Sequence, residues 1–165
     1  MTSSIDDLKA AFAGESQANR RYLAFAEAAE KEGYKQIARL FRAAAAAETV
    51  HAHSHLRAMG GIKSTAENLQ EAINGENYEA TKMYPDFIQD AEADGNTRAL
   101  RSFQHAIEAE KIHENLFSQA LETISQDAEE YDYYICPVCG HTVARNAPEK
   151  CPVCGVKGER FQQIQ

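Results

Sequence analysis

The chain has 165 residues, enough for one sizeable core and a small accessory module. Its formal net charge of -8 at pH 7 argues against nucleic acid and anionic membranes as partners. No apolar run approaches the roughly 20 residues of a membrane-spanning helix. The N-terminal segment has no basic region followed by an apolar one, so we expect no export signal.

Residues 4–125 are rich in helix-forming residues and predict four long helices. Apolar residues recur at spacings of three and four in the ranges 8–29, 37–58, 69–87 and 99–124. Glycines follow the first three ranges and indicate helix ends, at Gly33, at Gly60 with Gly61, and at Gly95. Pro85 lies inside the third range and is expected to kink that helix, because proline has no amide hydrogen to donate.

Acidic and imidazole side chains interrupt the apolar stripe of each predicted helix, and they do so in two copies. Glu15 is followed by Glu48-Thr-Val-His51. Glu76, 61 residues after Glu15, is followed by Glu110-Lys-Ile-His113, 62 residues after the first pair. Because residues three apart lie on adjacent turns of one helix face, each pair can offer one oxygen and one nitrogen to one ion.

Four glutamates buried together are costly, because each is desolvated and each repels the others. Two bound cations remove both costs. The doubled set therefore predicts two metal ions side by side in a four-helix bundle made of two hairpins. Oxygen ligands with two imidazoles favour iron or manganese.

Glu79 breaks the symmetry of the repeat. It lies one turn beyond Glu76, and its counterpart in the first half is Ala18. A seventh ligand on one side would make the two metal positions unequal, so that one ion could exchange ligands while the other stays fixed. The alternative is that Glu79 is a solvated surface acid.

Two tyrosines follow the isolated glutamates by about two turns each, Tyr22 after Glu15 and Tyr84 after Glu76. Either could donate a hydrogen bond to a metal carboxylate or carry an electron, and either could serve packing alone. We take both as candidate catalytic residues, together with His51 and Glu79. The remaining histidines are interpreted as surface residues: His53, His55, His105 and His141.

The helical pattern ends near Asp127, and residues 131–165 predict a second domain. This segment contains all four cysteines of the chain, in two Cys-x-x-Cys pairs: Cys136, Cys139, Cys151 and Cys154. Two such turns complete a tetrahedron of thiolates, which suits zinc or a single iron. Beside a two-metal redox bundle we favour iron, since a one-electron relay then has a purpose. Cysteines used in this way indicate a reducing compartment, so the cytoplasm is the expected location. The expected domains are 1–127 and 131–165.

Several stretches of the chain resemble the rubrerythrin family over almost its whole length. They are Ala11-Phe-Ala-Gly-Glu-Ser-Gln-Ala18, both Glu-x-x-His pairs, the segment from Gly75 to Pro85 with Glu76, Glu79 and Met83-Tyr-Pro, and both cysteine turns. The resemblance implies an all-α, ferritin-like four-helix bundle followed by a rubredoxin-like domain.

The same resemblance implies a peroxidase that reduces hydrogen peroxide to water in oxidative-stress defence. It implies two iron ions held by Glu15, Glu48, His51, Glu76, Glu79, Glu110 and His113, and a third iron held by Cys136, Cys139, Cys151 and Cys154, where zinc could substitute. One iron would move between His51 and Glu79 as its oxidation state changes. A reductase or a rubredoxin would supply the electrons. The chain would form a homodimer, with the rubredoxin-type iron of one subunit near the di-iron site of the other.

Two other functions are compatible with this fold. One is a ferroxidase or iron-handling protein, although storage of iron has no need of a reducing relay. The other is a sensor of peroxide or oxygen that signals through a partner. Fold alone does not decide among these functions.

Overall fold

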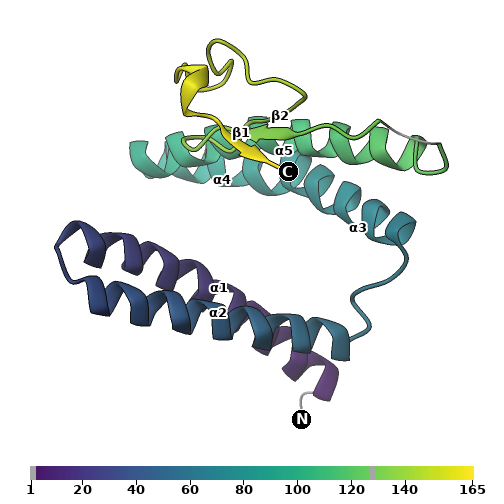
Figure 1. Ribbon diagram of the computed structural model, residues 1–165. Coiled ribbons are helices and arrows are strands. Elements are labelled where there is room, and N and C mark those ends of the chain that lie inside the picture. The colour runs from purple at the N-terminus through teal and green to yellow at the C-terminus, as the bar shows by residue number, and fades with distance from the viewer. Residues whose placement is uncertain (1–2, 127–128) are drawn as a thin grey trace. The chain divides into compact units, whose positions relative to one another are not determined.

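The computed structural model describes residues 3–126 and 129–165. Its helices are α1 (Ser4–Lys31), α2 (Lys35–Ala58), α3 (Thr65–Tyr78), the π-helix η1 (Glu79–Met83), α4 (Tyr84–Ala93) and α5 (Thr97–Glu122). Its strands are β1 (Tyr133–Ile135), β2 (Thr142–Ala144) and β3 (Gln162–Ile164), with a short 3₁₀-helix η2 (Gly158–Arg160) before β3. Because α3, η1 and α4 follow one another directly, the described residues contain the four predicted helices, the third in three parts (Figure 1).

The chain divides into two compact units, one ending at Lys63 and the other beginning at Ser64. The first is the α1–α2 hairpin. The second contains α3 to α5 and the three strands, and β2 contacts α5 within it. The predicted boundary at Asp127 lies outside the described residues, and the division into 1–127 and 131–165 stays a prediction. In the described part of the chain, none of the helices is both long and apolar enough to cross a membrane.

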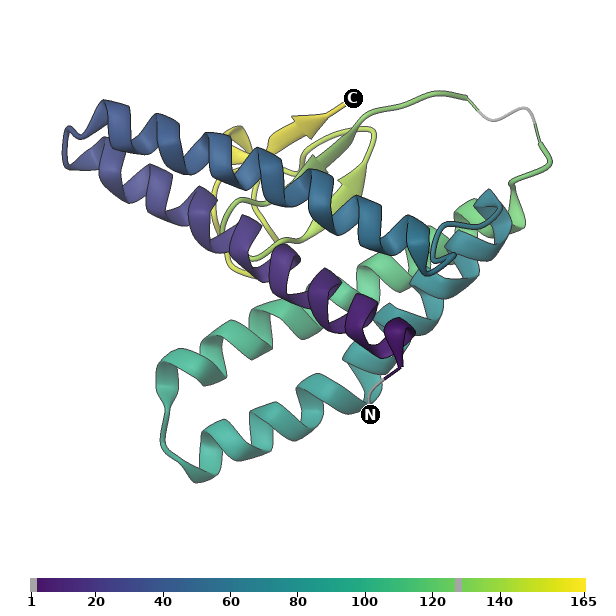
Figure 2. The same cartoon turned by 90° about the horizontal axis from the view of Figure 1, so that it is seen from below.

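The first hairpin is held together by small side chains. α1 begins at a capping box in which the side chains of Ser3 and Asp6 each accept a hydrogen bond from the other's backbone amide. The buried residues of the two helices are all alanines: Ala18, Ala26, Ala29, Ala38, Ala45 and Ala52. They let α1 and α2 run closely side by side (Figure 1 and Figure 2). The Asn19 amide links the helices by donating to the Ala45 carbonyl at 2.7 Å.

The π-helix marks a one-residue insertion in the second half of the repeat. Glu79 follows its counterpart Ala18 by 61 residues, whereas Tyr84 follows Tyr22 by 62. The extra residue thus falls within Glu79–Met83, the stretch that forms η1. Pro85, which was expected to kink this helix, occupies the first turn of α4, directly after the π-helix, and the kink itself stays a prediction.

The C-terminal part is a small antiparallel sheet in the order β2-β1-β3. Its interior consists of Cys136, Cys139 and Cys151 with Val153, Cys154, Val156 and Phe161 packed against them. His141, expected on the surface, is buried at 9% exposure. The expectation was wrong because the imidazole packs edge-on against Phe161, with the ring centres 6.4 Å apart.

Candidate metal centres

The first hairpin brings together Glu15 of α1 with Glu48 and His51 of α2. One ligand atom from each lies within 4.8 Å of the others. The helical spacing of three places Nδ1 of His51 2.9 Å from Oε2 of Glu48. The His51 side chain is 55% exposed and that of Glu48 is 18% exposed. The hairpin thus presents two oxygens and one nitrogen on one face.

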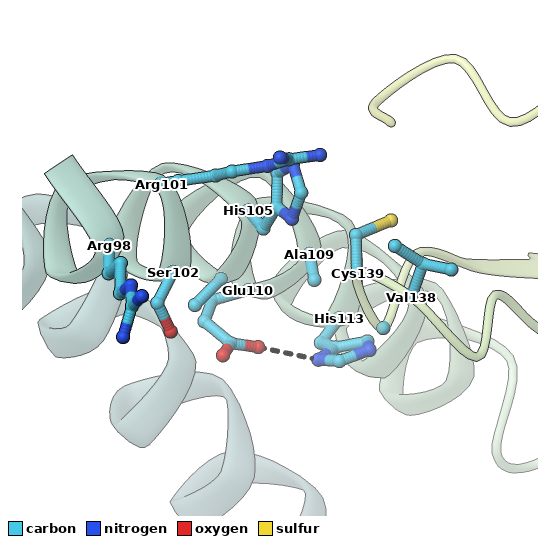
Figure 3. A pocket seen from close by; sticks show the side chains of 11 residues that line it. Arg98, Arg101, Ser102, His105, Ala109, Glu110, His113, Val138 and Cys139 are labelled. Atoms are coloured by element: carbon cyan, nitrogen blue, oxygen red, sulfur yellow. Dashed lines mark hydrogen bonds and ion pairs between the residues drawn. The ribbon is translucent and has the colours of Figure 1, made fainter. Parts of the chain in front are cut away.

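The second unit holds an equivalent group of Glu76, Glu110 and His113, again within 4.8 Å. Nδ1 of His113 lies 2.8 Å from Oε2 of Glu110 and 3.7 Å from Oε2 of Glu76. Figure 3 shows the Glu110 and His113 side chains pointing toward one another from α5. The His113 side chain is 27% exposed, against 55% for His51 in the first group.

The electrostatics of the second group favour a bound cation. Burial, followed by the negative charge of Glu110, raises the pKa of Glu76 to about 7. The same two causes raise the pKa of Glu79. Carboxylates that hold protons at neutral pH release them when a divalent cation takes the place of the proton. Each group therefore offers a donor set that fits iron or manganese.

The other predicted site residues lie around these groups. Glu79 is the first residue of η1 and lies within electrostatic reach of Glu110 and His113, outside the three-residue group. Burial, and then the charges of Glu110, Glu79 and Glu76, raise the pKa of Tyr84, so its phenol keeps its proton.

The two tyrosines occupy equivalent places in the repeat. Tyr22 packs with Phe25 and Phe41, at ring-centre distances of 6.4 and 6.2 Å. Tyr84 packs with Phe87 and Phe103, at 6.2 and 6.1 Å. Their catalytic roles, and the membership of Glu79 in a metal site, stay predictions.

The four cysteines meet at one point in the C-terminal sheet domain. All four sulfurs lie within 4.8 Å of one another, with Cys136–Cys154 and Cys139–Cys151 distances of 3.5 Å. Thiolates around one zinc or iron would be separated by about 3.8 Å, so little movement is needed. Gly140 and Gly155 follow the two turns with φ of 79° and 77°, a left-handed conformation that glycine adopts without strain.

Backbone amides prepare part of this cluster for metal binding. Burial works to raise the pKa of the Cys151 thiol, but the backbone N–H groups of Cys154 and Val153 outweigh it and lower the value to about 7. Burial raises the pKa of Cys139. A metal must displace the remaining thiol protons, and the tetrahedral sulfur set fits zinc and iron equally.

The first cysteine turn packs on α5 beside the second carboxylate group. Ala109 is 3% exposed, and a Cβ atom placed on Gly140 would lie 3.7 Å from the Ala109 Cβ. A pocket of about 600 Å³ opens between them, lined by Arg98, Arg101, Ser102 and His105 of α5 and by Val138 and Cys139 of the turn (Figure 3).

A direct polar contact crosses from the sheet to α5, between Nε2 of His113 and Oγ1 of Thr142 at 2.9 Å. Sequence reasoning missed this contact, because a single threonine 29 residues away carries no periodic pattern.

Comparisons with known proteins agree with these features. The rubrerythrin family profile matches residues 6–121, and the profile of the rubrerythrin rubredoxin-like domain matches residues 134–162. Rubrerythrin-2 of Clostridium acetobutylicum is 40% identical, over 95% of this chain and 94% of its own. Nigerythrin of Nitratidesulfovibrio vulgaris is 39% identical, over 92% of this chain and 82% of its own.

Solved structures of nigerythrin are similar in fold. The partially reduced state has a TM-score of 0.61 and 36% identity, covering 99% of this chain and 88% of that one. The fully reduced, all-ferrous state has a TM-score of 0.61 and 35% identity with the same coverage. The predicted fold class, a ferritin-like four-helix bundle with a rubredoxin-like domain, is confirmed by the two profile matches. The chain therefore belongs to the rubrerythrin family.

Proposed function

We propose that this protein is a non-haem di-iron peroxidase that reduces hydrogen peroxide to water. One observation supports the proposal most strongly: the four-thiolate cluster packs on the helix that also provides Glu110 and His113. A catalyst that is re-reduced one electron at a time needs a redox centre close to its active site. A storage protein or a sensor has no such need.

The residues that would hold the two irons are Glu15, Glu48, His51, Glu76, Glu79, Glu110 and His113. Cys136, Cys139, Cys151 and Cys154 would hold the third. Iron in the carboxylate groups would supply the two electrons that, with two protons, convert one hydrogen peroxide into two waters. Glu76, whose pKa is raised to about 7 in the metal-free chain, would release its proton on binding iron. Tyr84 keeps its phenolic proton and can donate a hydrogen bond to a nearby carboxylate.

Exchange of the metal between His51 and Glu79 is part of the same proposal. Glu79→Ala is expected to lower peroxide turnover by about 10-fold or more, the loss typical when a metal's surroundings are disturbed. Glu71→Ala is the matched control, since Glu71 is an exposed acid on α3, the helix that leads directly into η1. Undiminished turnover in the Glu79 variant would exclude ligand exchange at this residue.

The role of the four-thiolate site can be tested by changing its metal. With iron at every site, we expect three irons per chain, sulfur-to-iron charge-transfer bands, and continuous consumption of peroxide when a reductase or rubredoxin donates electrons. With zinc at the thiolates and iron at the carboxylates, a single turnover should survive and continuous turnover should stop. Equal continuous turnover in both forms would refute the relay.

The alternative is a ferroxidase that stores iron. It predicts a large hollow shell in sedimentation and rapid oxidation of added ferrous iron without a need for the thiolate site. A small oligomer that consumes peroxide steadily would exclude both storage and a purely sensory role. Because the four thiols must stay reduced to bind metal, the proposal keeps the cytoplasm as the expected compartment.

We also propose that the protein works as a homodimer in which hairpins are exchanged. A ferritin-like bundle has one connection that runs the length of the bundle. Here α2 has 24 residues, or about 36 Å, but only six residues separate Ala58 from Thr65. Six residues span at most about 22 Å. The connection is too short for that crossover, so the α1–α2 hairpin of one copy would complete the ligand set of the second copy.

A further inference from the structure

We propose that Thr142 is a positioning residue for His113: its hydroxyl accepts a hydrogen bond from Nε2 and holds the ring with Nδ1 turned toward the carboxylates of the second group. The proposal rests on the metal-binding role of His113 and does not depend on peroxide turnover.

The hydrogen bonds around Thr142 determine which atom donates and which accepts in each. Oγ1 of Thr142 lies 3.0 Å from the carbonyl oxygen of Gly140 and 2.9 Å from Nε2 of His113. A carbonyl oxygen can only accept, so the hydroxyl hydrogen goes to Gly140. The same oxygen must then accept from the histidine, which requires a hydrogen on Nε2.

The other ring nitrogen, Nδ1, faces carboxylate oxygens, which accept hydrogen bonds before a metal binds and would share the metal with Nδ1 afterwards. Nδ1 is the atom that faces the Oε2 atoms of Glu110 and Glu76, at 2.8 and 3.7 Å. A ligand histidine in a metal site normally donates its second N–H to an oxygen, which fixes the tautomer and the ring orientation. Glu76, His113 and Thr142 also line one pocket, so the three lie together.

The hydrogen bond between His113 and Thr142 also connects the second carboxylate group to the four-thiolate cluster of the same chain. From Cys139 the covalent chain reaches the Gly140 carbonyl, and two hydrogen bonds then lead through Thr142 to the His113 ring. The first Glu-x-x-His pair differs: Nε2 of His51 has no hydrogen-bond partner among the described residues, and its side chain is 55% exposed. His113 thus has a polar partner at each ring nitrogen, whereas His51 has one only at Nδ1 among the described residues.

The test compares Thr142→Val, which keeps the shape and removes the hydroxyl, with Thr142→Ser, which keeps the hydroxyl. Each full-length variant is prepared with one equivalent of zinc, which thiolates take in preference to carboxylates. ¹⁵N NMR of labelled histidine then reports whether Nε2 of His113 carries a hydrogen at one fixed pH. We expect a hydrogen on Nε2 in the wild type and in the serine variant, and partial loss of this hydrogen in the valine variant, whose ring can keep its hydrogen on Nδ1 opposite Glu110.

A cobalt(II) titration followed by visible absorption then measures binding to the second carboxylate group. The valine variant should bind about 10- to 100-fold more weakly, the usual effect of losing a histidine's outer partner, and the serine variant should match the wild type. A valine variant that keeps the wild-type hydrogen on Nε2 and the wild-type cobalt affinity would overturn the proposal. Loss of affinity in both variants would also overturn it, since it would indicate a packing role.

Discussion

An exchanged dimer and an unexchanged dimer should give opposite peroxide turnover in a heterodimer made from two differently altered chains. Two chains are altered, one in the first ligand group (Glu15→Gln with His51→Ala) and one in the second (Glu76→Gln with His113→Ala). Co-expression with two different tags isolates the heterodimer. If hairpins are exchanged, one of its two sites receives both intact groups and the other receives both altered ones. Turnover per dimer should then be about half that of the wild type.

The matched control carries all four substitutions on one chain and pairs it with an unaltered chain. In an exchanged dimer each site then receives one damaged group, so activity should vanish. In an unexchanged dimer the results are reversed, with no activity when the lesions are on separate chains and about half when they share one. Iron bound at the carboxylate sites, counted after subtracting one thiolate-bound iron per chain, should follow the same proportions as peroxide turnover. Half activity in the control heterodimer would refute exchange outright.

Two further predictions concern the second unit. Ala109→Leu adds three carbons at a close contact, since the Ala109 Cβ lies only 3.7 Å from the position that a Cβ on Gly140 would occupy. The overpacking should lower the free energy of unfolding by about 1–3 kcal/mol and weaken docking of the cysteine turn on α5. Ala47→Leu, at the equivalent and exposed position of the repeat, should be nearly neutral, and equal melting temperatures for the two variants would contradict this contact. The pKa of Glu76 in the folded chain, about 7, lies above its ordinary value of 4.5, so its contribution to the stability of the metal-free protein is complete below pH 4.5 and is lost as the pH rises through 7. The melting temperature of the metal-free wild type should therefore fall more over this range than that of Glu76→Gln, and parallel curves would count against the assignment.

Much of the architecture could be predicted from the sequence because its ligands repeat. Glu48 with His51 and Glu110 with His113 are spaced for one helix face, and each pair lies on the hairpin that also provides an isolated glutamate. The grouping into two sets of three follows from local helix geometry. The cysteine turns are equally local, since Cys-x-x-Cys followed by glycine forms one tight turn.

The features that were not predicted depend on less local information. The π-helix had a readable signal, since the offset between the two halves changes from 61 at Glu79 to 62 at Tyr84. Helical periodicity tolerates one extra residue, so the pattern still indicated a single helix there. The contact of Thr142 with His113 and the burial of His141 depend on how a short sheet packs, and three-residue strands carry almost no pattern.

The two halves of the repeat hold their histidines differently, and this difference supports the proposed exchange of the metal between His51 and Glu79. A metal that leaves one ligand for another needs a ligand that is easily released and a second that is within reach. His51 is the more exposed of the two histidines, at 55% against 27% for His113, which is also tied to Thr142. Glu79 begins the π-helix that only the second half contains. In the proposed exchange, the histidine that is released and the acid that replaces it would thus belong to opposite halves of the repeat, whereas His113 is tied to Thr142 beside the thiolate cluster.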